Sequence, residues 1–408
     1  MLPLDKIFLE KNHKTLVDNS LYDLFTNNTL ISPPSYNNLN VNVARPSLPP
    51  LIEFLPYLEN IWKSGHITND GNYHKEFENK LAKHLDVSNM CLLSNGTLAL
   101  LLALKSLKLK GEIITTPYSF IATTHVIKWN GLKPVFCDID EKTLNIDASK
   151  IESLISNKTE AILATNVYGM PCDFKLIKKI ADKYNLRIIY DSAHAFGVKE
   201  NGKSILTNGD ISILSFHGTK VFTTFEGGAI ISKDKKIKED IDSLKNFAIK
   251  NEEVVDGLGI NAKMNEFQAA LGLLQLKYIK SYIKKRSVFY NIYMESIRDI
   301  QGIKTINFPK NIDNNYSYFP ILISKNKYGK SRDELFNYLL KNEIFARKYF
   351  YPLISNFPLY SNLKSSNKTL LPVANKISSE IICLPMHTHL RLKDVYKIVK
   401  LIRDFSRS

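Results

Sequence analysis

Between about residue 73 and residue 234, short apolar runs alternate with amphipathic segments, and this alternation restricts the fold more than any other feature of the chain. The apolar runs indicate strands at residues 90–94, 112–117, 133–139, 161–169, 186–191, 211–214 and 227–234. Apolar residues at helical spacing indicate helices at residues 75–85, 96–109, 120–131, 148–156 and 174–185. This order predicts an α/β fold with a mostly parallel central sheet that is flanked by helices on both faces.

The pattern changes near Met264. Residues 265–297 contain no proline and predict one long helix that could bridge two domains. Beyond it, we expect strands and helices to alternate at residues 316–324, 331–342, 380–385 and 392–405. That composition indicates a smaller α+β domain.

We therefore expect three regions. They are an N-terminal extension at residues 1–41, a large α/β domain at residues 42–275, and the long connecting helix with a small C-terminal domain at residues 276–408. The extension is rich in Asn, Ser and Pro and has no sustained periodicity. It can be a disordered arm or an irregular segment packed on another surface, and both alternatives stay open.

The composition is that of an ordinary globular chain, with 44% hydrophobic and 23% charged residues among 408. No apolar run approaches the roughly 20 residues that a membrane-spanning helix requires, and the first residues do not resemble a signal peptide. We expect a cytoplasmic protein without membrane insertion. The cysteines lack any C-x-x-C pair, so we expect reduced, buried thiols and neither a disulfide framework nor a metal site.

The formal net charge of +15 raises the question of a nucleic-acid or membrane partner. The lysines are spread along the chain, and their local clusters fall on expected helices, where a solvated helix face is the commoner explanation. We therefore expect no nucleic-acid partner. A phosphorylated small substrate would also benefit from the positive field.

Candidate site residues stand where predicted strands end, the edge at which open parallel sheets bind ligands. Residues 94–97, Ser-Asn-Gly-Thr, open a helix and could hold an anion, although the same pattern is also a common helix cap. Asp191 follows three apolar residues, so it is either a shielded carboxylate that needs a cation or an ordinary turn residue. His194 and Phe120 could each be core residues or ligand contacts.

Lys220 lies in a run of small and hydroxylated residues, 215–229, with Glu226 as its single acidic neighbour there. Such a setting confines one amine, which could form an imine with an aldehyde. Asp191 could pair with a protonated pyridine nitrogen, and the glycine turn at residues 94–97, helped by Ser215, could hold a phosphate. A lysine Schiff base with an acidic partner for the ring nitrogen is the binding signature of pyridoxal phosphate.

Several segments resemble the signatures of the DegT/StrS group of bacterial nucleotide-sugar aminotransferases. They are LSNGTLAL, TTPYSFIATTHVI, YDSAHAFG, SFHGTKVFTTFEGGA, GINAKMNEFQAALGLLQL and ICLPMH. The resemblance runs from about Arg45 to the C-terminus. It implies the fold of type I pyridoxal-phosphate aminotransferases, with a central sheet of the seven-stranded type, in a homodimer whose subunits share their active sites.

The resemblance also assigns roles to single residues. Lys220 matches the Schiff-base lysine and Asp191 the partner of the pyridine nitrogen. His194 is expected near the ring hydroxyl, with Phe120 stacked on the ring. The positions that match phosphate contacts are Gly96, Thr97, Ser215 and, reaching in from the other subunit, Asn261.

Within the group, RPSLPPL together with two of these segments looks closest to enzymes that use L-glutamate to aminate dTDP-4-keto-6-deoxyglucose at C4, for O-antigen or other surface glycans. Amination at C3 of a 3-keto sugar is an alternative that uses the same machinery. A non-catalytic basic regulatory or nucleic-acid-binding protein is a distant alternative that only the net charge supports. A dehydratase of the same fold is disfavoured because those relatives typically replace the lysine.

Two positions depart from the group's pattern. Gly218 stands where alanine is usual in the lysine motif, and we expect this change between small residues to be tolerated. Asn72 stands where proline commonly follows glycine, so the sequence does not determine the shape of that loop.

Overall fold

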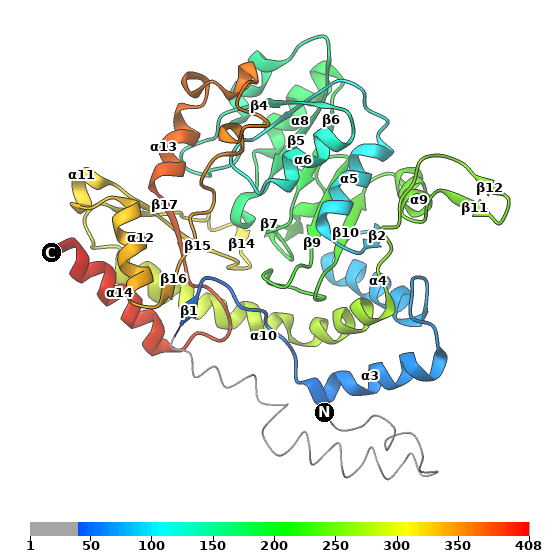
Figure 1. Cartoon of the computed structure of the whole chain (residues 1–408), viewed down its shortest axis with the longest axis horizontal. Helices are drawn as coiled ribbons and strands as arrows, with labels where there is room; N and C mark the ends of the chain where they lie inside the picture. The colour runs from blue at the N-terminus through cyan, green and yellow to red at the C-terminus, as the bar shows by residue number, and fades with distance from the viewer. Residues whose placement is uncertain (1–39, 408) are drawn as a thin grey trace.

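The structure is a computed structural model that describes residues 40–407, so the expectations for residues 1–39 of the extension lie outside the described residues. A seven-stranded sheet occupies its centre (Figure 1). In spatial order its strands are β2 (Asn89–Leu93), β10 (Gly228–Ser232), β9 (Ile211–Ser215), β6 (Arg187–Asp191), β5 (Thr159–Thr165), β3 (Glu112–Thr115) and β4 (Lys133–Phe136).

Five neighbouring strands, β9, β6, β5, β3 and β4, pair in parallel, while β10 is antiparallel to both β9 and β2. The predicted α/β class and the mostly parallel, seven-stranded sheet are confirmed. The expected strand ends were wrong in one respect, because residues 116–117, 137–139 and 166–169 lie beyond the strands. After β5 the chain turns at once into a 3-10 segment, Val167–Gly169, and leaves the sheet.

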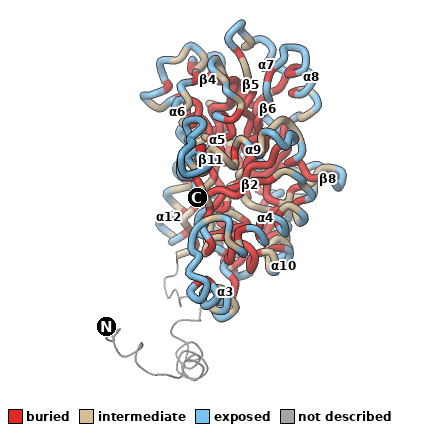
Figure 2. The backbone as a smooth tube through the Cα atoms, turned by 90° about the vertical axis from the view of Figure 1, so that its right-hand side faces the viewer, coloured by how far each residue is buried: buried red, intermediate tan, exposed pale blue. Residues whose placement is uncertain are grey.

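Helices cover both faces of the sheet because consecutive strand residues point to opposite sides. In β9, Ile213 packs with the helices of one face and Leu214 with those of the other. The first face carries α5 (Gly96–Ser106), α6 (Ala122–Trp129) and α9 (Lys235–Leu244). The opposite face carries α4 (Asn72–Leu85), α7 (Ala148–Ile151) and α8 (Phe174–Tyr184). The buried sheet runs through the middle of the molecule in Figure 2.

The predicted long helix is confirmed as α10, Glu266–Ile297, which runs for 32 residues beneath the sheet in Figure 1. The Asn265 side chain accepts the Gln268 backbone N–H, and the Gln268 side chain accepts the Asn265 backbone N–H. This capping box determines where the helix begins. Its N-terminal half packs on α4 and on α3 (Leu51–Ser64). Its C-terminal half, through residues such as Tyr293, packs in the core of the C-terminal domain.

The C-terminal part is built on an antiparallel three-stranded sheet of β13 (Ile303–Thr305), β15 (Phe319–Ile323) and β17 (Ile381–Leu384). Four helices accompany it, α11 (Lys325–Tyr328), α12 (Arg332–Lys341), α13 (Pro372–Glu380) and α14 (Leu392–Arg407). One face packs on α10, α12 and α14, whereas the other packs with Tyr118 and Tyr168 of the large domain. The second contact places this sheet beside the carboxyl end of the central sheet.

Short elements complete the described chain. They are β1 (Val41–Asn42) with β16 (Ile344–Phe345), β7 (Lys199–Glu200) with β8 (Lys203–Ser204) and β14 (Ile312–Asp313), and the hairpin of β11 (Ile249–Asn251) and β12 (Val254–Val255). The hairpin projects from the body at the right of Figure 1 and is exposed in Figure 2. Within residues 40–407, no helix combines the length and apolarity that crossing a membrane demands. The four cysteines are free and buried, as expected.

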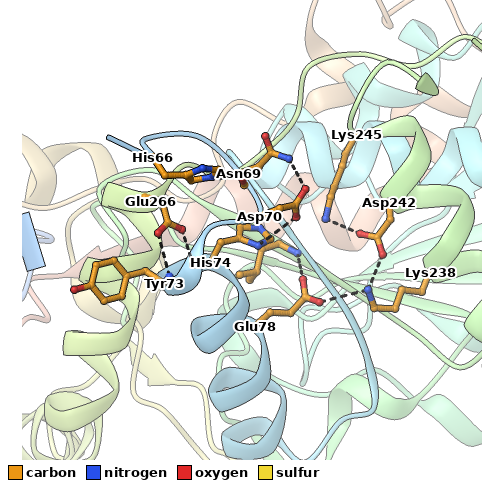
Figure 3. A network of polar contacts seen from close by, with 11 residues as sticks. His66, Asn69, Asp70, Tyr73, His74, Glu78, Lys238, Asp242, Lys245 and Glu266 are labelled. Carbon is orange, nitrogen blue, oxygen red and sulfur yellow. Dashed lines mark hydrogen bonds and ion pairs between the residues drawn. The ribbon is translucent and has the colours of Figure 1, made fainter. Parts of the chain in front are cut away.

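A network of polar contacts joins α4 to α10 and to α9 (Figure 3). The Glu266 carboxylate accepts the backbone N–H groups of Tyr73 and His74, at 3.0 and 2.7 Å, and so caps α4 from outside. A Cβ atom at Gly71 would lie 2.4 Å from the Glu266 carboxyl carbon, so a larger residue there would require the Glu266 side chain to move. Asn72 is the first residue of α4, a position that also suits proline. The departure at residue 72 therefore leaves the helix start intact.

The crossing of α10 and α4 leaves no room for a side chain at Gly272. A Cβ atom there would lie 2.4 Å from the ring of Phe77, which is fully buried and stacks on Phe222. We expect G272A to lower the free energy of unfolding by about 1–3 kcal/mol, because overpacking outweighs the better helix propensity of alanine. Denaturant unfolding measures the change. The control is G218A, whose Cβ would meet its nearest atom at 3.7 Å; equal stability of both variants would contradict the prediction.

Candidate active site

A cavity of about 360 Å³ opens where the strands of the central sheet end. Seven of the eight predicted site residues line it, namely Gly96, Thr97, Phe120, Asp191, His194, Ser215 and Lys220. The C-terminal domain contributes Tyr318, Arg347, Tyr349 and Phe350 to its wall. The volume lies within the range of about 300–1,000 Å³ that is usual for small-molecule sites.

Lys220 enters the cavity from the loop that follows β9. The loop is closed at its base by a hydrogen bond from the Phe216 N–H to the Gly227 carbonyl, 2.8 Å, and the Lys220 N–H donates to the His217 carbonyl, 2.9 Å. Burial of the amine lowers the pKa of Lys220 to about 8, and the attraction of Asp191 opposes this shift. The side chain can thus exchange a proton close to neutral pH.

Asp191 is the last residue of β6 and is 5% exposed. Its Oδ2 accepts a hydrogen bond from the Thr123 hydroxyl, 2.7 Å, and its Oδ1 accepts from the Ala193 N–H, 3.1 Å. Burial raises the pKa of the carboxyl, while both hydrogen bonds and the charge of Lys220 counteract the rise. Asp191 is therefore both the shielded carboxylate and the turn residue that the sequence allowed.

His194 lies on the same turn and is also buried. Its Nδ1 accepts the Tyr168 N–H, 3.1 Å, so a neutral ring carries its proton on Nε2. Burial lowers the pKa of His194 well below its ordinary value, with Lys220 adding to the shift. The ring lies nearly parallel to that of Phe350, at 3° with centroids 6.1 Å apart. His194 is thus a neutral donor within the cavity.

The residues predicted for a phosphate gather at the start of α5. Asn95 is the cap of this helix, and its side chain accepts the Leu98 N–H at 2.8 Å. Gly96 and Thr97 form the first turn, where backbone N–H groups have no partner within the helix. A Cβ atom at Gly96 would lie 2.8 Å from the Ser215 Cβ, so only glycine lets the helix start approach β9 this closely.

Two of the predicted site residues are exposed; one of them lines the cavity and the other does not. Phe120 is 59% exposed while it lines the cavity, so it is no core residue and its ring is free to cover a ligand. Asn261 does not line the cavity of its own chain. It is exposed and forms a β-bridge with Asn246, near the projecting hairpin. Its predicted contact with the phosphate of a second subunit stays a prediction.

The residues present fit pyridoxal phosphate. The cavity joins an amine whose pKa desolvation lowers, one buried carboxylate, a neutral histidine and an exposed aromatic ring. The close approach at Gly96 forms a glycine cradle at a helix N-terminus, which is a typical setting for a phosphate. Lys220 and Asp191 would hold the two ends of the reactive ring, and Gly96, Thr97 and Ser215 its phosphate.

Sequence reasoning missed two groups of cavity residues. Ser119 and Thr165, with Thr123 behind them, form hydroxyl contacts near Asp191. The segment TTPYSFIATTH contains two of them, but hydroxyl residues are common at helix starts and carried no distinct signal. The C-terminal wall was missed because Tyr318 and Arg347 lie about 100 residues or more beyond Lys220, in segments without a motif.

Fold and site together define an aminotransferase of the type that uses pyridoxal phosphate. A model of the DegT/DnrJ/EryC1/StrS aminotransferase family matches residues 52–403, and the chain belongs to this family. The predicted family, enzyme class and cofactor are confirmed.

The chain resembles several characterised members. It is 50% identical over 369 residues to dTDP-4-amino-4,6-dideoxy-D-glucose transaminase of Escherichia coli, covering 90% of this chain and 99% of the relative. GDP-perosamine synthase of Escherichia coli O157:H7 is 34% identical over 353 residues, 86% of this chain and 94% of that protein. The solved structure of DesI in the presence of its TDP-sugar product superposes with a TM-score of 0.86 at 29% identity, covering 90% of this chain and 93% of that one.

The titration of Lys220 can be measured directly in the cofactor-free protein. Because its neutral form dominates above a pKa of about 8, we expect competitive acetylation of Lys220, read by peptide mass spectrometry, to rise with a midpoint near pH 8. D191N should move the midpoint lower, since the carboxylate's attraction is lost. A midpoint at the ordinary lysine value of about 10.4 would contradict the buried placement of the amine.

Proposed function

We propose that this aminotransferase moves the amino group of L-glutamate to C4 of a nucleotide-linked 4-keto-6-deoxy-D-glucose, with dTDP as the nucleotide. The observation that carries the proposal is the 50% identity to the transaminase of dTDP-4-amino-4,6-dideoxy-D-glucose, which extends over 99% of that relative. The product would serve the synthesis of amino sugars for O-antigen or other surface glycans. The reaction would take place in the cytoplasm.

The catalytic parts follow from the cavity. Bound pyridoxal phosphate supplies an aldehyde that reacts with amines and a ring that withdraws electrons from the reacting carbon. Lys220 would hold the aldehyde end, and as a free amine with a pKa of about 8 it would move a proton between the substrate carbon and the cofactor carbon. Asp191 would hold a proton on the ring nitrogen, and the His194 Nε2–H would be available to the ring hydroxyl. Phe120 would cover one face of the ring.

Arg347 suits the anionic substrates. Its backbone is fixed by paired hydrogen bonds with Cys383, 3.1 and 2.7 Å, while its exposed side chain lines the cavity. Among the described residues, no hydrogen bond or ion pair engages its guanidinium. Glutamate and a nucleotide sugar are both anions, so this charge would attract either of them, and the net charge of +15 would assist.

Amination at C4 is better supported than the C3 alternative. The relatives from Escherichia coli and Shigella dysenteriae, at 50% and 49% identity, both carry names that place the amino group at C4. A relative from Geobacillus stearothermophilus, 30% identical over 359 residues, is named a pleiotropic regulatory protein. Lys220 and the buried Asp191, which line one cavity, support catalysis rather than such a role here.

We further propose a homodimer with shared active sites. Asn261 lies apart from its own cavity, next to a segment with exposed apolar side chains such as Val255 and Leu258, at 64% and 76% exposure. Exposed apolar side chains of this kind are typical of interfaces. A two-fold axis that buries this segment would bring Asn261 to the cavity of the partner subunit.

The proposed reaction is tested with purified protein, glutamate and a panel of dTDP- and UDP-linked keto sugars, with the new amine located by NMR. We expect an amine at C4 of the dTDP sugar. K220A should lower turnover by at least about 10²–10⁴-fold, the usual contribution of a positioned acid/base. K105A, which changes an exposed lysine on α5, is the matched control. An amine at C3 would overturn the substrate, and full activity of K220A would overturn the mechanism.

Shared sites predict complementation between two inactive variants. In a heterodimer of K220A with N261A, one of the two sites contains both intact residues. After unfolding and refolding an equal mixture, we expect activity to recover to about a quarter of the wild-type value, since half of the dimers are mixed and each has one intact site. Sites built from a single chain would give no recovery above the sum of the separately refolded variants.

A further inference from the structure

Three buried hydroxyl groups lead in a line to the Asp191 carboxylate. Thr165 Oγ1 lies 3.1 Å from Ser119 Oγ, Ser119 Oγ lies 2.8 Å from Thr123 Oγ1, and Thr123 Oγ1 lies 2.7 Å from Asp191 Oδ2. All three residues are less than 5% exposed. They come from the end of β5, the loop after β3 and the first turns of α6, so three separate elements build the line.

The direction of every hydrogen bond in this line is determined. The ionised carboxylate can only accept, so the single hydroxyl proton of Thr123 points to Asp191. Ser119 must then donate to Thr123, and Thr165 must donate to Ser119. All three O–H dipoles thus point their positive ends toward the carboxylate, and each bond polarises the next.

The charge of Asp191 depends on this line because little else compensates it. Burial favours the neutral carboxyl. Among the described residues, Lys220 is the charged group that acts on the carboxyl. His194 lies on the same turn and stays neutral, because burial lowers its pKa well below the ordinary value. Among the described residues, the hydrogen-bond donors to the carboxylate are the Thr123 hydroxyl and the Ala193 N–H.

We propose that Thr165, Ser119 and Thr123 form a positioning relay that keeps the Asp191 carboxylate ionised and oriented for the ring nitrogen of the bound cofactor. The inference rests on the proposed pairing of Asp191 with that nitrogen. The relay acts through Asp191 and touches no reacting atom. It sets how firmly the ring nitrogen holds its proton, and thereby how strongly the ring withdraws electrons.

The test uses the loaded enzyme in the absence of substrate. The variants T123V, S119A and T165V each remove one hydroxyl from the relay. The visible absorption band of the bound cofactor is titrated with pH, and the cofactor dissociation constant and Tm are measured in parallel. Loss of a relay hydroxyl raises the proton affinity of the Asp191 carboxylate, which then competes with the ring nitrogen for its proton. The positive charge on the ring is reduced. The Lys220 nitrogen, joined to the cofactor, then keeps its own proton to higher pH. The pH midpoint of the visible-band titration therefore rises.

The rise in the pH midpoint should become smaller as the removed hydroxyl lies farther from Asp191 along the relay. T123V removes a hydrogen bond to a charged group, so we expect its midpoint to rise by about one pH unit. T165V acts only by polarisation, at about 10–30% of that shift, and S119A should lie between them. T123S, which keeps the hydroxyl, should restore the wild-type midpoint.

Thr124 provides a matched control. It is the next residue of α6, is fully buried, and its hydroxyl has no hydrogen-bond partner among residues 40–407. T124V should therefore leave the midpoint unchanged. If T123V lowers Tm but shares the midpoint of T124V, the hydroxyls are only structural and the relay is overturned while the proposed function stands. If the wild-type protein forms no visible band with pyridoxal phosphate, the proposed function falls as well.

Discussion

The burial of one carboxylate at the end of a central strand is the constraint on which the site depends. Asp191 can keep its charge only if compensating groups reach it, and they come from three directions. The Thr123 hydroxyl on α6 and the Ala193 N–H of its own turn donate hydrogen bonds, and the positive charge of Lys220 after β9 attracts the carboxylate. Each of these groups must be positioned by its own element. The mutual placement of α6, β6 and the β9 loop is therefore as much a requirement of electrostatics as of core packing.

The order of strands in the sheet supplies this placement. In the parallel part of the sheet, β3, β5, β6 and β9 end at the same edge, so residues that follow them in the sequence become neighbours in space. The antiparallel strand β10 returns the chain from the Lys220 loop and pairs with β2, which brings the start of α5 beside Ser215. The positions of the glycine cradle at the start of α5 and of the Lys220 amine thus both follow from the strand pairing of the sheet.

Much of this could be predicted from the sequence, because strand and helix periodicities are local and the edge at which parallel strands end follows from topology. Lys220 could be proposed as a site residue because it stands in a run of small and hydroxylated residues, whereas position alone left Asp191 open between a shielded carboxylate and a turn residue, and the family resemblance assigned its role. The aromatic wall at Tyr318 and Phe350 could not be predicted, because its residues come from irregular segments that only tertiary packing brings to the cavity. The strand ends were placed too late, since apolar residues such as Val167 stay buried after the chain has left the sheet. The role of Asn261 requires a second chain.

The unbroken length of α10 has a consequence for how such a chain can vary. Its two halves are embedded in different hydrophobic cores, and each helical residue turns the chain by about 100° and advances it by about 1.5 Å. An insertion of one residue at its midpoint would rotate the C-terminal domain about the helix axis. This rotation would move Arg347 away from Lys220. This helix therefore has to keep its residue count if both cores are to stay packed.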